Sequence, residues 1–461
     1  MKKINIIIIG LAAVVFTGCK SLYGKYERPD VDTEGLFRDP ISLRDTLVSN
    51  DTTSFGNLPW REVFTDPHLQ SIIERALTNN VDLLNAALNV KMVEEQLKIA
   101  KLAFLPSVAV SPQGTISSFD GNAATKAYTL PISASWNVDL FGNLLNAKRS
   151  VQMQLLATKD YQTVVQVNII SGVANLYYTL LMLDRQLEIM IDMTELTKQT
   201  WERMKLLKET RVGYRSTAVQ SAEASYLSVQ ASTVDLKRQI REIENSLTLL
   251  MGETAFAIDR GKLEEQQLPS KFSTGVGIQL LNNRADVHAA ELTLASCFYD
   301  INMARSRFYP NITITGTGAF TNNNGLVDPG KILLSAVGSL VQPIFQHGQI
   351  VAGLKVAKMK YEQAYNTWQN TILKAGNEVS NALVLYNSSE EKSQIEAKQI
   401  AVLRQNVQDT KASYGLNNTN YLEVITAQSS LLNAEISKVT DDFNKVQAVV
   451  NLYVALGGGA K

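Results

Sequence analysis

The sequence predicts an α+β membrane protein in which a short β-sheet continues into long helices and in which the chain is internally duplicated. Three observations support this fold class: a repeated strand-to-helix plan, alternating strands of bilayer length, and apolar stripes that persist over many helical turns. Phe104-Leu105-Pro106 recurs as Phe308-Tyr309-Pro310 (310 − 106 = 204), and Phe141 recurs as Phe345 (345 − 141 = 204). Such a unit cannot bury its apolar surfaces alone, so we expect the copies to pack side by side.

The N-terminus has the pattern of a processing signal. Lys2 and Lys3 precede a mostly apolar run, 4–15, and then the segment Phe16-Thr17-Gly18-Cys19. The run is shorter than the roughly twenty residues that span a bilayer. Small residues directly before a cysteine resemble the lipobox of bacterial lipoproteins, so we expect cleavage after residue 18 and acylation of Cys19. A plain secretory peptide with a chance cysteine is the alternative.

The mature chain is close to neutral. Removal of residues 1–18 takes away two lysines (44 − 2 = 42 basic against 44 acidic side chains), and nothing suggests a nucleic-acid partner. Cys297 is the only other cysteine, so the lipidated form has no intramolecular disulfide. The three histidines, His68, His288 and His347, lie far apart, and no metal-ligand cluster, phosphate-binding loop or nucleophile motif is present. We expect no enzyme activity, no cofactor and no metal site.

Two segments, 107–140 and 311–344, change from helical to strand periodicity. In the first, every second residue is apolar: Leu130, Ile132, Ala134, Trp136 and Val138. Four strands of about ten residues have the length that spans a bilayer when the strands are tilted. The candidates for aromatic side chains at the membrane boundary are Trp136, Tyr128 and Phe119. Packing of Trp136 in the junction between barrel and helices is the alternative.

The number of strands predicts the oligomer, because four strands cannot close a barrel. Unpaired N–H and C=O groups at open sheet edges cost several kcal/mol each in lipid, so the edges must pair with other subunits. Two chains would give eight strands, whose interior is filled by side chains, and three would give twelve and leave a lumen. We therefore expect a homotrimer with a twelve-stranded barrel in a lipid bilayer.

Each strand pair is expected to continue into a helix of about forty-five residues, roughly 65 Å long at 1.5 Å per residue. The returning helices, 219–250 and 425–453, carry apolar residues at alternating steps of three and four. This 3.5-residue period indicates helices that supercoil against neighbours. Irregular joints at 211–214 and 414–418 are interpreted as part of a mixed belt around the middle of the helical wall.

The tips of the two helical hairpins are expected at 184–185 and at 387–392. In a trimer, a carboxylate that faces the axis is repeated three times and forms a ring that repels anions and can be bridged by cations. The candidates for such a periplasmic gate are Asp184, Glu390 and Glu391. Ordinary solvated charges at helix turns are the alternative.

The predicted organisation has six parts. They are a signal peptide 1–18, a lipidated extended arm 19–65, a first repeat 66–260, a linker 261–282, a second repeat 283–457 and a C-terminal tail 458–461. The strand pairs 107–140 and 311–344 lie inside the two repeats.

Five segments resemble a known family. They are Trp136-Asn137-Val138-Asp139-Leu140-Phe141-Gly142, the stretch 283–291, Phe64-Thr65-Asp66-Pro67-His68-Leu69, Tyr26-Glu27-Arg28-Pro29 and Asn420-Tyr421-Leu422-Glu423-Val424. All are similar to the TolC-like outer membrane factors, in the lipoprotein branch that serves resistance-nodulation-division (RND) efflux pumps. The resemblance covers nearly the whole mature chain. Ala285 stands where the family more often has proline, and Gln346-His347-Gly348 replaces the usual acidic-glycine pair.

The resemblance implies a trimeric twelve-stranded barrel that continues into a twelve-helix periplasmic tunnel, closed at its far tip until a membrane-fusion adaptor protein and an inner-membrane RND transporter engage it. It implies a passive outer membrane channel for drugs or other toxic compounds. Two alternatives stay open. One is the outer membrane duct of a type I protein secretion system. The other is a periplasmic coiled-coil adaptor without a pore, which would lack bilayer-length strands.

Overall fold

The computed structural model describes residues 23–30, 55–118, 120–121, 124–210, 215–267, 269, 283–322, 331–344, 346–415 and 420–460. These residues form two compact units, which are described separately. Unit 1 comprises 1–31, 88–160 and 289–370, and unit 2 comprises 32–87, 161–288 and 371–461. The expected modification site, Cys19, and the aromatic candidate Phe119 lie outside the described residues.

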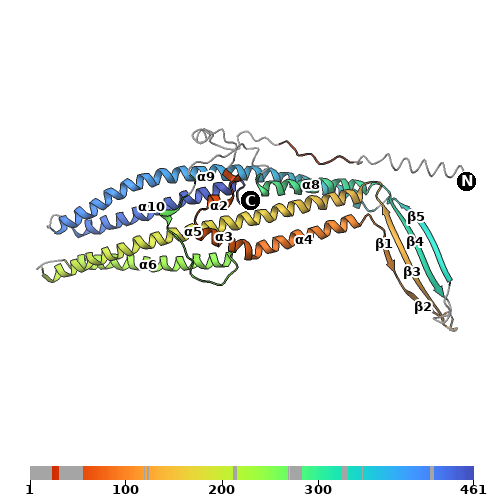
Figure 1. Ribbon diagram of the computed structural model, residues 1–461, viewed down its shortest axis with the longest axis horizontal. Helices are drawn as coiled ribbons and strands as arrows, with labels where there is room; N and C mark the ends of the chain where they lie inside the picture. Colours follow the sequence, from red (N-terminus) through yellow and green to blue (C-terminus); the bar gives the residue numbers. More distant parts are fainter. Residues whose placement is uncertain are drawn as a thin grey trace. The chain divides into compact units, whose positions relative to one another are not determined.

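Unit 1 contains a single antiparallel sheet (Figure 1). Its strands are β1 (Ser107–Val110), β2 (Gln113–Ser117), β3 (Thr125–Val138), β4 (Asn311–Asn322) and β5 (Lys331–Val341). The order is β1-β3-β4-β5, and β2 also pairs with β3. Since β4 occupies one side of β3, β1 and β2 share the other side and act as one interrupted edge strand. The sheet therefore has four strand positions and two open edges.

Six helices repeat the same order around the two strand pairs (Figure 1). They are α4 (Val81–Leu102), α5 (Asn143–Thr210) and α6 (Ser216–Leu250), followed by α8 (Ala285–Ser306), α9 (Gln349–Gly415) and α10 (Tyr421–Ala455). With 68 and 67 residues, α5 and α9 are longer than the expected forty-five. The reason is that no proline interrupts either helix, so the pieces at 190–210 and 391–413 continue without a break.

The expected hairpin tips at 184–185 and 387–392 were wrong, because these residues lie inside continuous helices. Ser388 and Ser389 favour turns in isolation, but Ser389 is buried and the Ser388 hydroxyl donates to the Leu385 carbonyl within α9. The reversal occurs instead between Thr210 and Ser216, where α5 ends and α6 begins. The predicted belt joints at 211–214 and 414–418 fall on residues outside the described ranges, apart from Tyr414 and Gly415 at the end of α9, so this part of the prediction stays untested.

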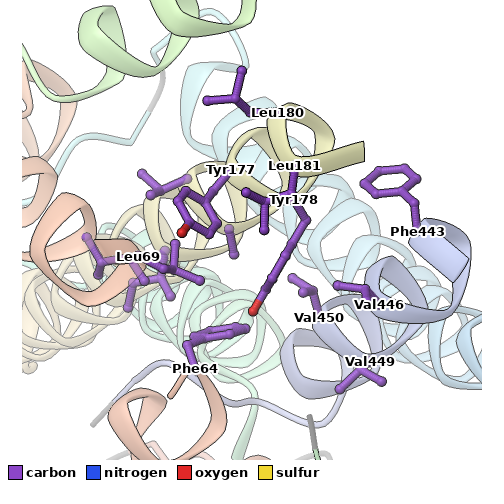
Figure 2. Packing of buried hydrophobic residues seen from close by; sticks show 14 of the residues in the cluster. Phe64, Leu69, Tyr177, Tyr178, Leu180, Leu181, Phe443, Val446, Val449 and Val450 are labelled. Atoms are coloured by element: carbon purple, nitrogen blue, oxygen red, sulfur yellow. The ribbon is translucent and has the colours of Figure 1, made fainter. Parts of the chain in front are cut away.

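The core of unit 2 lies where α5 and α10 meet the helix α3 (Pro67–Asn79) (Figure 2). Tyr177 and Tyr178 on α5 are almost fully buried, as are Leu69 on α3 and Val450 on α10. α5 also holds an eighteen-residue stretch that is apolar and long enough to cross a membrane, but 44% of it is buried inside the protein. The buried apolar residues of this stretch pack in the core of unit 2, as expected for the apolar stripe of a long helix.

A belt of mixed structure wraps the core of unit 2, and it is built from three segments, 55–66, 251–267 and 453–459. It contains η1 (Phe55–Asn57), α2 (Trp60–Val63) and η2 (Leu263–Glu265). The Tyr453 hydroxyl donates to the Leu58 carbonyl at 2.6 Å. A Cβ at Gly56 would lie 2.3 Å from the Leu456 carbonyl oxygen, so only glycine permits this contact.

Candidate functional site

The sheet has two chemically different faces, because directly paired residues in neighbouring strands point to the same side. One row across the sheet is apolar or small: Val110, Ile132, Gly318 and Leu334. The adjacent row is polar or small: Ala109, Ser133, Thr317 and Ser335. The alternation predicted for the first strand pair therefore extends over β1, β3 and β4, whereas β5 also places Leu333, Val337 and Val341 on the side of Ser335. We call these sides the apolar face and the polar face.

Nothing within the described residues covers the apolar face. Leu334 is 80% exposed, Leu340 is 66% exposed and Ile132 is 50% exposed. Gly318 leaves a gap in this face, and the Leu334 side chain fills it, since a Cβ at Gly318 would lie 3.3 Å from Leu334 Cδ2. An apolar surface of this extent is expected to contact lipid or another protein rather than water.

The two described aromatic candidates lie at opposite ends of β3 and on the apolar face. Tyr128 pairs with Gly114 and Asn322 near the loop end. Trp136 lies near the helix end, 42% exposed, and its indole Nε1 donates to the Phe104 carbonyl at 2.9 Å. Trp136 thus contacts the junction between sheet and helix while its ring stays accessible.

The turn from β3 into α5 is shaped by the segment Asp139–Gly142. The Asp139 carboxylate accepts from the Leu145 amide at 2.7 Å, which satisfies a free donor in the first turn of α5. Gly142 has φ +70°, a conformation that favours glycine. Phe141 stacks on Tyr309, with ring centroids 4.9 Å apart. The motif therefore serves a sharp strand-to-helix turn, as its sequence context predicts.

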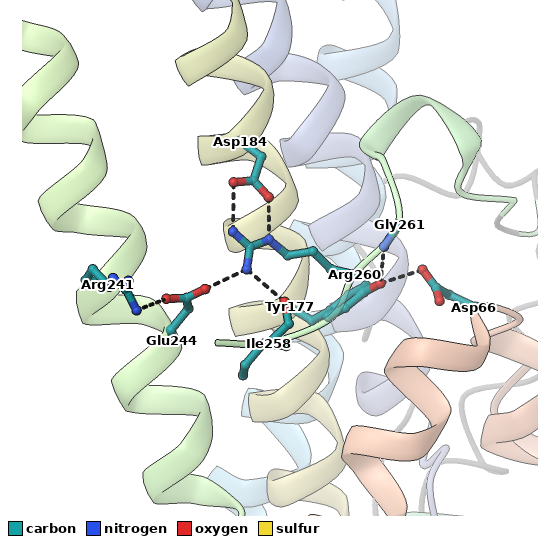
Figure 3. A network of polar contacts seen from close by, with 8 residues as sticks. All are labelled: Asp66, Tyr177, Asp184, Arg241, Glu244, Ile258, Arg260 and Gly261. Carbon is teal, nitrogen blue, oxygen red and sulfur yellow. Dashed lines mark hydrogen bonds and ion pairs between the residues drawn. The ribbon is translucent and has the colours of Figure 1, made fainter. Parts of the chain in front are cut away.

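In unit 2, a network around Arg260 ties the belt to the helices (Figure 3). The Arg260 guanidinium donates to both carboxylate oxygens of Asp184 on α5, at 2.5 and 3.0 Å, and to Glu244 on α6 at 2.7 Å. Burial alone would lower the pKa of Arg260, but the hydrogen bonds that it donates to the Asp184 and Glu244 carboxylates raise it. Sequence reasoning missed Arg260, because only the fold brings residues 184, 244 and 260 together.

The same belt segment contacts the start of α3 through Asp66. This carboxylate caps α3 by accepting from the His68 amide at 2.8 Å, and it accepts from the Tyr177 hydroxyl at 2.6 Å and from Gln266 Nε2 at 2.8 Å. Burial raises the pKa of Asp66, but the hydrogen bonds from Tyr177, Gln266 and the backbone outweigh it and leave the pKa lowered. The segment Phe64–Leu69 in the sequence is therefore a structural joint.

A second buried arginine explains another of the family-like segments. Arg284 is 7% exposed, and its guanidinium donates to Asp286 at 2.7 Å, to Glu378 on α9 at 2.6 Å and to the Ala455 carbonyl at 3.2 Å. Burial lowers the pKa of Arg284, and the pairing with Asp286 and Glu378 raises it above the usual value. Arg284 thus connects α8, α9 and the end of α10.

The three gate candidates do not lie together at a tip. Asp184 binds Arg260, and Glu390 forms an ion pair with Lys445 on α10 at 2.9 Å. The hydrogen bond from Lys445 lowers the pKa of Glu390. Glu391 is exposed on α9. Across the described ranges, no group of three or more His, Cys, Asp or Glu side chains is placed to hold a metal ion.

An open antiparallel sheet with one lipid-compatible face, continued by long helical hairpins, defines the class of outer membrane channel subunits. The family model "Outer membrane efflux protein" matches residues 72–253 and again 277–458. The chain therefore belongs to the outer membrane efflux protein family, a family of channel proteins, and it is the outer membrane channel component of an efflux system. Membership in this family of channel proteins excludes one alternative from the sequence analysis, a periplasmic adaptor without a pore.

Relatives and solved structures agree over nearly the full length. The chain is 28% identical to the cation efflux system protein CusC of Escherichia coli K12, over 97% of this chain and 98% of CusC. It is 25% identical to the probable outer membrane lipoprotein SilC of Salmonella typhimurium, over 96% of each. The fold matches the open state of the Neisseria gonorrhoeae MtrE outer membrane channel with a TM-score of 0.84, at 24% identity, over 96% of this chain and 99% of MtrE.

Proposed function

We propose that three copies of this chain join edge to edge into a twelve-stranded barrel, continue into a twelve-helix periplasmic tunnel, and conduct toxic compounds passively to the exterior. The supporting observation is the sheet, which combines an uncovered apolar face, a polar face and two open edges. Open edges are not tolerated in lipid, so β5 of one copy pairs with the β1 and β2 edge of the next. The polar face then lines the lumen.

Three is the number of copies that leaves a passage. Each chain supplies four strand positions, and eight strands would give an interior that side chains fill. The polar face carries Thr313, Thr315, Thr317 and Ser335, which are small hydroxyl side chains suited to a wide aqueous lumen. Twelve strands therefore form the smallest closed assembly with a lumen.

The N-terminal arm supports a lipid anchor at Cys19. The Arg28 guanidinium binds Glu291 on α8 with two hydrogen bonds, at 2.8 and 2.6 Å, and the Tyr26 ring meets Phe298 edge-on. The acyl chains are held near this part of unit 1, because four residues from Cys19 to Tyr23 reach at most about 14 Å. Two or more acyl chains give stable anchoring, where one chain does not. A Cys19→Ser variant should lose the lipid mass and partition poorly into membranes.

The aromatic residues Tyr128 and Trp136 are placed to meet the two surfaces of the bilayer. They are 136 − 128 = 8 residues apart in β3, which corresponds to about 26 Å of strand. This length is close to the roughly 25 Å apolar band of outer membrane barrels. We assign Trp136 to the periplasmic boundary and Tyr128 to the outer one.

Among the gate candidates, Glu391 is the strongest. The carboxylates of Asp184 and Glu390 are used in ion pairs within one chain, whereas Glu391 is exposed on α9. Three copies of Glu391 would form a ring of charge, provided that this side of α9 faces the axis. Replacement of Asp184, Glu390 and Glu391 by their amides tests the proposal, and an unchanged single-channel conductance would exclude a gate at these positions.

The channel has no energy source of its own, so a periplasmic membrane-fusion adaptor and an inner-membrane RND transporter supply cargo to it. The test of the proposed function is reconstitution of the purified protein into planar bilayers. We expect discrete conductance steps from the trimer. Absence of steps from well-folded trimer would contradict a pore.

A further inference from the structure

A small cavity near the ends of the helical hairpins in unit 2 is lined by two cations. It has a volume of about 100 Å³ and is lined by Gln199, Thr200, Arg203 and Met204 on α5, Lys411 and Tyr414 on α9, and Val424 on α10. Arg203 lies seven residues before the end of α5, and Lys411 lies four residues before the end of α9 (210 − 203 = 7; 415 − 411 = 4). The cavity therefore joins the two hairpins close to their ends.

The cations of the cavity are the exposed Arg203 and the half-buried Lys411. Among the described residues, no carboxylate lies within ion-pair distance of Arg203 or Lys411. Burial lowers the pKa of the Lys411 ammonium, and the nearby Arg203 lowers it further. A like charge near the half-buried Lys411 destabilises the free protein. This arrangement contrasts with Arg260, Arg284 and Lys445, each of which has acidic partners.

The other polar groups of the cavity already have partners. Gln199 Nε2 donates to Glu195 at 3.0 Å, and the Thr200 hydroxyl donates to the Leu196 carbonyl and accepts from Gln428 at 2.9 Å. The groups of the cavity that are left to bind a ligand are thus the cations Arg203 and Lys411. A volume of 100 Å³ equals about three water molecules, which is room for the end of one acidic side chain.

We propose that this cation cavity, lined by Arg203 and Lys411, is a docking site for a carboxylate side chain of the periplasmic partner protein that engages the hairpin ends. The proposal rests on the adaptor partnership proposed above and names the chemistry of one contact. Charge complementarity supports it: an acidic side chain would insert between the two cations, neutralise their repulsion and accept hydrogen bonds from a guanidinium. The repulsion between the two cations, which destabilises the free protein, is then relieved in the complex.

The test uses the full-length lipoprotein with both cations replaced, Arg203→Gln and Lys411→Gln together. Lys205→Gln is the matched control, because Lys205 is an exposed lysine on the same turn of α5 and does not line the cavity. In a strain that depends on this protein for efflux, we expect the double variant to lower the tolerated drug concentration by about tenfold, as expected for loss of a charge pair. The purified double variant should melt a few degrees higher than wild type, because the repulsion is removed.

Three outcomes would overturn the proposal. Unchanged resistance would show that no partner needs the cations. Loss of single-channel conductance in the double variant would assign the cations to the pore itself. Loss of the trimer would assign the carboxylate to a second copy of this chain. If wild type itself fails to conduct, the proposed pore fails, whereas the thermal shift of the double variant still tests the unpaired charges.

Discussion

The sheet of unit 1 and the belt of unit 2 differ in whether their apolar side chains are buried and their polar groups are paired. In the sheet, large apolar side chains such as Leu334 and Leu340 are exposed, and two edges have no partner strand among the described residues. In the belt, Phe64 and Tyr453 are buried, and charged groups such as Arg260 have acidic partners. The difference teaches that the belt is stabilised by its own chain, whereas the sheet needs lipid and other copies.

The largest expected effect comes from a charge on the apolar face. Ile132→Lys places an ammonium near the middle of β3, where lipid contact costs about 2–4 kcal/mol per chain. Ser133→Lys is the matched control, because Ser133 is the next residue and points to the polar face. We expect the first variant to lose insertion into lipid vesicles and the second to retain it. Equal insertion of the two variants would show that the faces are assigned wrongly.

The second effect concerns the Arg260 network in the belt. Arg260→Met leaves Asp184 without its cation and leaves Glu244, whose side chain is 6% exposed, with only the exposed Arg241 at 3.4 Å. Loss of one partner of a buried pair costs about 3–5 kcal/mol, and the partial exposure of Asp184 reduces this to roughly 2–3 kcal/mol. Chemical denaturation monitored by circular dichroism measures the change.

The control for that variant is Arg238→Met, which removes an exposed ion pair with Glu242 within α6. An exposed pair of this kind contributes little to stability, so we expect a much smaller loss than for Arg260→Met. Similar losses in the two variants would mean that the Arg260 network does not hold the belt.

A smaller effect is a dependence of belt stability on pH through Asp66. The folded pKa of Asp66 is lowered, so its stabilising contribution is complete above the unfolded pKa of about 4 and is lost as the pH falls through the folded pKa. Asp66→Asn should therefore be less stable than wild type at neutral pH by about 1 kcal/mol, because the amide oxygen keeps the helix cap but loses the charge that strengthens the hydrogen bonds from Tyr177 and Gln266. The difference in unfolding free energy between wild type and Asp66→Asn, measured by urea titration, should be smaller near pH 3 than at neutral pH. A difference that does not change with pH would refute the role of the carboxylate.

The smallest effect is expected for Trp136→Phe, which removes the hydrogen bond to the Phe104 carbonyl. We expect a loss of about 1 kcal/mol, since the ring and its lipid contact are retained. In a protein with the other tryptophans replaced, brominated lipids should quench Trp136 best when the bromine lies near the headgroups. Strongest quenching from the bilayer centre would remove Trp136 from the boundary.

Periodicity in the sequence predicted the elements that depend on local pattern. The alternation from Leu130 to Val138 gives β3 its two faces, and the repeated 204-residue offset gives the matching order of strands and helices. The hairpin tips at 184–185 and 387–392 were placed wrongly, because polar residues within a long helix resemble a turn when their tertiary partners are unknown. Arg260 supplies the partner that keeps Asp184 inside α5.

Sites made by residues far apart in sequence could not be predicted from pattern. Arg203 and Lys411 are 208 positions apart (411 − 203 = 208) and meet only because the two hairpins pack together. Arg284 and Asp286 were recognised as part of a family-like segment, but their contact with Glu378 depends on the packing of α8 against α9. The sheet edges, by contrast, followed directly from the count of strands.

Native mass spectrometry of the protein released from outer membrane lipid tests the central claim most directly, because it counts the chains that complete one cylinder. The account predicts a complex of three identical chains that dissociates only together with loss of β-structure. A folded species of one or two chains with its sheet intact would contradict it.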